Sequence, residues 1–321
     1  MDIKDKSPEK QESPKERALE ELESFANNPG LEELASLFGT ESLPEGTSDR
    51  LAVLQELAVQ HWDFRKGAER QAVDWSESGE IEEGSEQWNT VFNSAEKLGL
   101  VQDTEPKNKN PDFLVILGGA NKAPLDRLRY GLSVVDDFDQ VVYLGSSRVV
   151  SDAEREKAQD YAPDAKTEFD LGSGAFETLL GARLVDEITV ERDGDTWGMR
   201  MYEFEVDGKP KTGFVLSTPQ TIQGNRATTY DNYKFFADRA ELAANPNKTV
   251  VAVTTGFYTS GQHLPAVHEL TLPFGTDVET VGHSAEYTGV KRQASQLLQE
   301  AKAAIDASVR LDQAITSKTN N

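Results

Sequence analysis

The 321-residue chain contains no cysteine. This absence excludes disulfides, thiolate nucleophiles and cysteine-ligated zinc. The sequence also lacks a long apolar run: no stretch approaches the about 20 residues that span a membrane. Its first residues, MDIKDKSP, lack the apolar core of a signal peptide. We therefore expect a cytoplasmic protein with no membrane partner.

Basic residues are scarce relative to acidic ones. The chain has 33 Lys and Arg against 56 Asp and Glu, for a formal net charge of −23 at pH 7. A chain of this charge repels nucleic acid as a whole, so nucleic acid is not an expected partner. The acidity itself is typical of a soluble surface. It leaves room for a local basic pocket.

The polarity pattern divides the chain into five parts. Residues 1–16 predict a disordered tail, because they carry too little apolar surface to offset ordering entropy. Residues 17–102 carry apolar stripes at helical spacing and predict a small helical N-terminal domain, the candidate surface for a protein partner. Residues 103–111 form a polar linker. Residues 112–313 predict an α/β domain with a C-terminal helix, and 314–321 a second tail.

The α/β part alternates apolar strands with helical patterns. The predicted strands include 113–117, 140–144, 213–217, 249–254 and 278–282, and a short helix is predicted over 175–184. Asp193-Gly194, between 187–191 and 197–206, predicts a β-hairpin. Such alternation is typical of a parallel sheet. The fold class is therefore α/β: a three-layer domain with a mostly parallel sheet and a β-hairpin insertion.

Three of these strands end in loops of small or polar residues, and these loops form the candidate site. Parallel strands place their C-terminal loops on one side of the sheet, where helix N-terminal amides favour anions. Two interpretations stay open for the first loop: a nest of backbone donors, or a plain strand-to-helix turn. The predicted ligand-binding residues in the loops are Gly118, Gly119, Asn121, Ser146, Ser147, Thr255, Gly256 and Tyr258.

Two arginines and one helix start add side chains to this crevice. Arg127 can face an anion at the sheet edge, and pairing with nearby acids is the alternative. Arg226 precedes a helix start in which Thr228 or Thr229 can cap amides and Asn232 can hydrogen-bond a ligand in both directions. We expect Arg226 to supply the positive charge for an anionic ligand. His283 follows the last strand, where a general base could sit. No metal site is predicted, and the sequence does not identify the catalytic residues.

The order of these motifs resembles the YdcF/SanA/ElyC-like family. That family has a Leu-Gly-Gly strand end, an Arg-bearing helix, a second strand ending in small residues, a Thr-x-x-Asn helix start and a Val-Thr-Ser-type strand end. The matches lie between about residues 112 and 285. They are Leu117-Gly118-Gly119, Arg127, Leu144-Gly145-Ser146-Ser147, Thr229-Tyr230-Asp231-Asn232 and Val253-Thr254-Thr255-Gly256-Phe257.

The chain also departs from that family. Ser146-Ser147 replaces paired glycines, Tyr258 stands where the family has His, and Gly261 stands where it has Arg. The resemblance implies a Rossmann-like domain. It also implies S-adenosylmethionine as a ligand, because one member binds it, whereas the lost His and Arg argue against carrying over any reaction.

Three hypotheses follow. The first is a cytoplasmic small-molecule-binding α/β protein, or an enzyme acting on a nucleotide-like or phosphorylated ligand. The second is a non-enzymatic protein-interaction module whose family site has decayed. The third is an S-adenosylmethionine-dependent transferase. It ranks last because no acidic residue stands at the end of a predicted strand, where it would bind the ribose hydroxyls. S-adenosylmethionine and a nucleotide are the cofactor candidates, while the missing G-x-G-x-x-G spacing argues against NAD.

Overall fold

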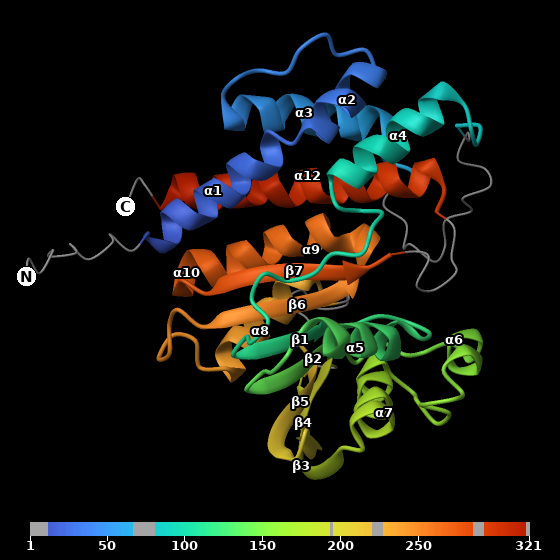
Figure 1. The fold of residues 1–321 in the computed structure, drawn as a ribbon, viewed down its shortest axis with the longest axis vertical. Coiled ribbons are helices and arrows are strands. Elements are labelled where there is room, and N and C mark those ends of the chain that lie inside the picture. Colours follow the sequence, from blue (N-terminus) through green and yellow to red (C-terminus); the bar gives the residue numbers. More distant parts are fainter. Residues whose placement is uncertain (1–11, 67–80, 193–194, 220–226, 285–291, 319–321) are drawn as a thin grey trace, which may run out of the picture.

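A computed structural model gives the fold of the chain (Figure 1). It describes residues 12–66, 81–192, 195–219, 227–284 and 292–318. The strands are β1 (Phe113–Leu117), β2 (Gln140–Ser146), β3 (Arg183–Arg192), β4 (Asp195–Val206), β5 (Lys209–Thr218), β6 (Thr249–Thr255) and β7 (Asp277–His283). The α-helices are α1 (Pro14–Ala26), α2 (Pro29–Leu37), α3 (Thr47–His61), α4 (Glu86–Lys97), α5 (Ala123–Val134), α6 (Asp152–Lys157), α7 (Glu168–Leu180), α8 (Thr229–Arg239), α9 (Thr259–Ala266), α10 (Leu272–Phe274) and α12 (Ala294–Ser317). A 3-10 turn, η3 (Gly256–Tyr258), and a π-helical turn, η4 (Val267–Thr271), flank α9.

The strands form a single seven-stranded sheet in the order β3-β4-β5-β2-β1-β6-β7. The strands from β5 to β7 in this order are parallel neighbours, whereas β4 pairs antiparallel with both β3 and β5. The predicted α/β class with a mostly parallel sheet is therefore confirmed. All five residues of β1 are buried, since helices cover both faces of a central parallel strand. Its even-numbered residues pack with α5 and α7, and its odd-numbered residues with α8 and η4.

Two elements differ from the sequence prediction. The strand predicted at 213–217 begins at Lys209, because a tight Asp207-Gly208 turn, with φ of 51° and 73°, folds β5 back on β4. The helix predicted at 175–184 covers Glu168–Leu180 instead, because Thr167 and Asp170 form a capping box at its start. The predicted hairpin is confirmed by the antiparallel pairing of β3 and β4, and its turn lies outside the described residues.

Both predicted tails are shorter than expected, because helices extend into the segments 1–16 and 314–321. Ser13 and Glu16 form a capping box, so α1 begins at Pro14, inside the segment 1–16. At the other end α12 continues to Ser317, past the boundary at 313, because Ile315 is buried against the helical core. No helix in the described part of the chain combines the length and the apolar character needed to cross a membrane.

The N-terminal helices share their hydrophobic core with the last helix of the chain. Buried residues of α1–α4, such as Leu54 and Trp62, belong to one cluster with Leu298 and Ile305 of α12 and Leu264 of α9. Figure 1 shows α12 lying between α1–α4 and the β7 side of the sheet. The division at 102 into a helical domain and an α/β domain stays a prediction, and the cluster spans that boundary.

The predicted linker lies along β7, the edge strand of the sheet. The Thr104 amide donates to the Gly282 carbonyl at 3.0 Å, and the Gly282 amide donates to Thr104 Oγ1 at 2.8 Å. The amides of Lys107 and Asn108 donate to the Glu279 carboxylate at 2.7 and 2.8 Å. These bonds cover a strand edge that would otherwise offer pairing groups to another chain.

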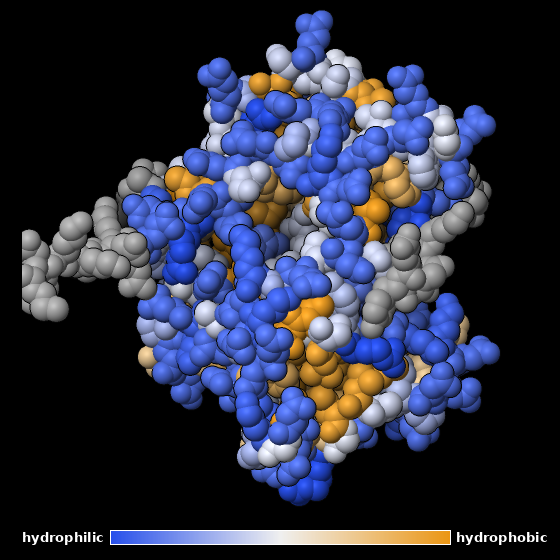
Figure 2. Space-filling view, viewed as in Figure 1, coloured by the Kyte–Doolittle hydropathy of each residue, from blue (hydrophilic) through white to orange (hydrophobic). Residues whose placement is uncertain are grey.

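The surface agrees with the acidic composition. Figure 2 shows that hydrophilic residues cover most of this face. Hydrophobic residues gather in its lower half, where Figure 1 places the sheet with α5 and α7.

Candidate functional site

The order in which the chain adds parallel strands to the sheet reverses at β1. The chain continues from β1 to its neighbour β2 on one side, whereas β6 flanks β1 on the other. Open α/β sheets bind ligands at the C-terminal ends of strands at such a switch point. The loops that follow β1 and β6 are therefore where a site is expected, and both belong to the predicted crevice.

Arg127, from α5, spans this switch point. Its Nη1 donates to the Leu117 carbonyl at 2.7 Å and to the Gly118 carbonyl, while Nε and Nη2 donate to Thr255 Oγ1 at 3.3 and 3.2 Å. A Cβ on Gly119 would lie 3.2 Å from Nη1, so this glycine leaves room for the guanidinium. Arg127 is only 3% exposed. It thus joins the ends of β1 and β6 through backbone and hydroxyl acceptors.

Tyr258 and His283 complete this group. The Arg127 guanidinium lies 5.8 Å from the Tyr258 ring centroid, and His283 is the register partner of Thr255. His283 is buried, with Nδ1 3.2 Å from the Ser284 carbonyl oxygen. Burial lowers the pKa of His283 below its ordinary 6.5, and the Arg127 charge adds to this effect. His283 is therefore held in its neutral form at pH 7.

This shift predicts a pH dependence of stability. Because the folded protein disfavours the His283 proton, the unfolded chain takes it up first as the pH falls below 6.5. The free energy of unfolding should therefore fall between about pH 6.5 and the lower folded pKa, and this contribution should be absent in His283→Gln. Urea unfolding at pH 7.5, 6.5 and 5.5 measures it. The control variant His61→Gln removes an exposed histidine outside the site and should show the same fall in stability as the wild type. If stability still falls over this pH range in His283→Gln, His283 is not the group responsible.

The loop after β2 carries a buried ion-pair cluster. Ser146 Oγ donates to Glu168 at 2.7 Å, and Arg148 binds both Glu168 at 2.7 Å and Glu154 at 3.0 Å. A Cβ on Gly118 would lie 3.2 Å from the Gly145 Cα, so the loop after β1 touches the C-terminal end of β2. Ser146 is thus committed to Glu168. The sequence patterns do not predict Glu168 or Arg148, although Arg148 lies four residues after the predicted strand 140–144.

The remaining predicted residues are scattered. Arg226 lies outside the described residues. Of the two predicted capping residues, Thr228 caps α8 and forms a capping box with Asp231, whereas Thr229 is the first residue of the helix. Asn121 adopts a left-handed φ of 58° before α5, and its carbonyl accepts the Tyr161 hydroxyl. Ser147 and Asn232 are half-buried, at the end of β2 and in the first turn of α8.

A cavity of about 890 Å³ opens beside this group, at the C-terminal ends of β6 and β7. Thr255, whose hydroxyl holds Arg127, lies in its wall together with Ser284. The opposite walls come from α4 and from the first residues of α12, which Figure 1 places beside the end of β7. Its other lining residues include Glu83, Trp88, Phe92, Glu96, Leu100, Gln102, Asp103, Phe257, Arg292, Ala294, Ser295 and Leu297.

The α12 side of the cavity is rich in hydrogen-bond donors. Ser295 lines it, is 5% exposed, and its Oγ has no hydrogen-bond partner among the described residues. The amides of Ala294 and Ser295 lie in the first turn of α12, where helical N–H groups lack intrahelical acceptors. Arg292 adds a positive charge, with its guanidinium carbon 4.0 Å from the Phe257 ring centroid. This wall suits an anionic or acceptor group.

Local sequence patterns do not predict these lining residues. α4 and α12 are distant along the chain, and only tertiary packing brings their ends together. One signal was available: Trp88 and Phe92 are four residues apart on a helix, and their rings stack at 4.0 Å.

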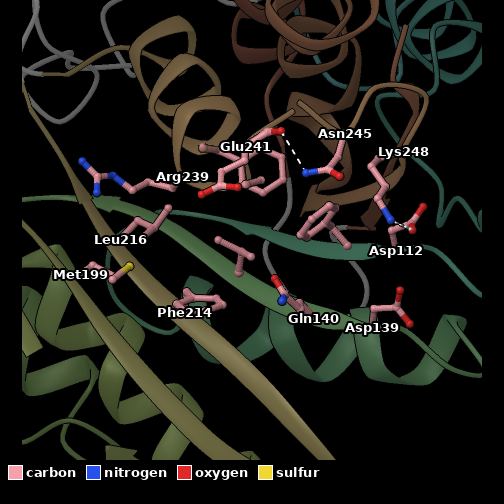
Figure 3. A pocket seen from close by; sticks show the side chains of 14 residues that line it. Asp112, Asp139, Gln140, Met199, Phe214, Leu216, Arg239, Glu241, Asn245 and Lys248 are labelled. Atoms are coloured by element: carbon pink, nitrogen blue, oxygen red, sulfur yellow. Dashed lines mark hydrogen bonds and ion pairs between the residues drawn. The ribbon is translucent and has the colours of Figure 1, made fainter. Parts of the chain in front are cut away.

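A smaller cleft, of about 370 Å³, lies at the N-terminal ends of β1 and β2 (Figure 3). Its Asp112 carboxylate pairs with Lys248 Nζ at 2.6 Å and accepts the Thr249 amide at 2.8 Å. Arg239 lies over the Trp197 and Phe235 rings, 5.3 and 5.1 Å from their centroids. These charged groups have partners within the protein, and this is the sheet edge where open α/β sheets seldom bind ligands. We therefore place the candidate site at the C-terminal edge.

The fold and the site define an α/β protein whose mostly parallel sheet carries a cavity at its switch-point edge. Residues 9–99, which include α1–α4, match the family model described as the Rv3785 N-terminal domain. The chain is 25% identical over 320 residues to Uncharacterized protein Rv3785 of Mycobacterium tuberculosis (strain ATCC 25618 / H37Rv), with 89% of this chain and 87% of the relative covered. The same values hold for Uncharacterized protein Mb3814 of Mycobacterium bovis (strain ATCC BAA-935 / AF2122/97). No solved structure gives a significant match to the chain.

Proposed function

We propose that this protein binds a small molecule with an anionic group in the cavity between α4, α12 and the C-terminal ends of β6 and β7. The observation that carries the proposal is the buried Ser295 hydroxyl, which lines that cavity without a partner among the described residues. Burying a hydroxyl without a hydrogen bond costs about 1–3 kcal/mol. A ligand that accepts from it would recover this free energy.

The position of the cavity supports the same function. It lies beside the sheet's switch point, where Rossmann-like folds hold their ligands, and we extend the proposal to that fold type. Its volume of about 890 Å³ falls within the range of small-molecule sites. The α12 N-terminus and Arg292 supply positive potential in a chain that is otherwise strongly acidic.

Ligand binding is favoured over the interaction-module hypothesis by one observation. The N-terminal helices, the predicted surface for a protein partner, share a core with α12, and α4 forms a wall of the cavity. They are thus built into the site. The YdcF/SanA/ElyC-like resemblance, the catalytic form of the hypothesis and S-adenosylmethionine as a ligand stay predictions.

A thermal-shift screen with two matched variants tests the proposal. The panel contains nucleotides, sugar phosphates, S-adenosylmethionine and aromatic carboxylates. A ligand at a hundred times its dissociation constant should stabilise the wild type by about 2.7 kcal/mol. Gln102→Trp places a bulky side chain in the cavity and should abolish the shift, whereas Gln140→Trp, in the cleft of Figure 3, should retain it.

If Gln140→Trp abolishes the shift and Gln102→Trp retains it, the ligand binds in the smaller cleft. A panel without any stabilising ligand would contradict the proposal and favour the interaction module.

A further inference from the structure

We infer that the cavity selects a small monoanion with an aromatic or apolar body, such as an aryl carboxylate, over polyphosphates and nucleotides. This inference rests on the proposed function and narrows its ligand class. The juxtaposition that carries it is a donor-lined inner wall on α12, an apolar wall on α4, and acidic side chains at the mouth.

The inner wall has capacity for one anionic group. Ser295 is 5% exposed and offers a hydroxyl, and the first-turn amides of α12 lie next to it. α12 has 24 residues, so its dipole is fully developed at this end. Arg292 is half-buried beside the same turn. A carboxylate is an acceptor that hydroxyl, amide and guanidinium donors all bind.

The mouth of the cavity disfavours further negative charge. Glu83, Glu96 and Asp103 line the cavity and are exposed, whereas Arg292 is the basic residue among the described lining residues. Like charges a few ångströms apart repel each other, and they repel more strongly where the site is partly desolvated. A triphosphate or diphosphate would bring several charges past these carboxylates. A monoanion whose charge lies at its inner end avoids them.

The remaining wall is apolar. Trp88 and Phe92 are half-buried and stacked on one another, and Leu100, Phe257 and Leu297 are buried beside the cavity. An aromatic or apolar ligand body would cover this surface and gain the free energy of its burial. The hydroxyl groups of a sugar phosphate would lose their hydrogen bonds to water against this apolar wall and gain none in return.

Isothermal titration of the full-length protein with three probes tests the ligand class. The probes are indole-3-acetate, its neutral isostere indole-3-acetamide, and ATP. We expect indole-3-acetate to bind at least tenfold more tightly than the amide, because a charge-assisted hydrogen bond is worth about 1.5–3 kcal/mol. ATP should bind more weakly than indole-3-acetate.

Two charge variants on the same part of the chain provide the matched comparison. Arg292→Gln should weaken indole-3-acetate binding about tenfold to a hundredfold and leave the amide unchanged. Arg310→Gln removes the same charge from an exposed position roughly 25 Å along α12 and should leave both affinities unchanged. Circular dichroism melting identifies a variant that has lost its fold, and Ser295→Ala then serves as the second test of the inner wall.

The outcomes separate this inference from the proposed function. Tighter binding of ATP than of indole-3-acetate, abolished by Gln102→Trp, would overturn the ligand class while the cavity remains the site. Equal affinity for the acid and the amide would overturn the anionic inner wall. If none of the probes binds and the thermal-shift panel is also silent, the proposed function fails with it.

Discussion

Replacing Ile116 with Asp is expected to leave the chain without a soluble folded state. Ile116 is 0% exposed in β1, and β1 lies between β2 and β6 in the sheet. Its side chain packs in the cluster formed with α5 and α7. An isolated carboxylate there would cost far more than the about 5–15 kcal/mol by which a whole domain is stable.

Soluble yield, size-exclusion chromatography and near-ultraviolet circular dichroism measure this outcome. Val149→Asp is the matched control, since Val149 is 73% exposed and should accept the charge with little change. A soluble Ile116→Asp variant with a native near-ultraviolet spectrum would contradict the central placement of β1.

Arg127→Met should lower the free energy of unfolding by about 3–5 kcal/mol. The substitution keeps much of the side-chain volume and removes every donor. The carbonyls of Leu117 and Gly118 and the Thr255 hydroxyl would lose their guanidinium partner in a buried place, and each unmet acceptor costs about 1–3 kcal/mol. The ends of β1 and β6 would then no longer be tied together.

Urea unfolding of Arg127→Met and Arg129→Met measures the difference. The Arg129 side chain is 50% exposed and pairs with Asp126 at 3.3 Å, so its loss should cost at most about 1 kcal/mol. Equal and small effects of the two substitutions would show that Arg127 does not join the two strand ends.

Strands with uninterrupted apolar residues were predictable, whereas elements that depend on polar residues were not. β1 was located to the residue because its apolar run of five has no polar gap. β5 begins in Lys209-Pro210-Lys211, which resembles a loop and becomes a strand only through pairing with β4. The start of α7 was missed because its buried Glu168 is stabilised by Arg148, a contact that no periodicity reveals.

The candidate site shows the same division. The pattern of apolar strands followed by small or polar residues predicts that Gly118 and Thr255 lie at one edge of the sheet, and Arg127 bridges them. This strand pattern does not predict which helices cover that edge. Ser295 and Trp88 meet across the cavity because two helices from opposite ends of the chain pack in one cluster, and local sequence patterns carry no information on such distant contacts.

The shared core of α1–α4 and α12 also sets an order of events during biosynthesis. At the about 5–20 residues per second of translation, Ser317 emerges roughly 10–40 s after Lys97. Throughout that interval the apolar faces of the first four helices lack the helix that covers them in the finished protein. The nascent N-terminal segment thus keeps part of its apolar surface uncovered until α12 has been synthesised. A messenger truncated before α12 would yield a product that cannot complete this core.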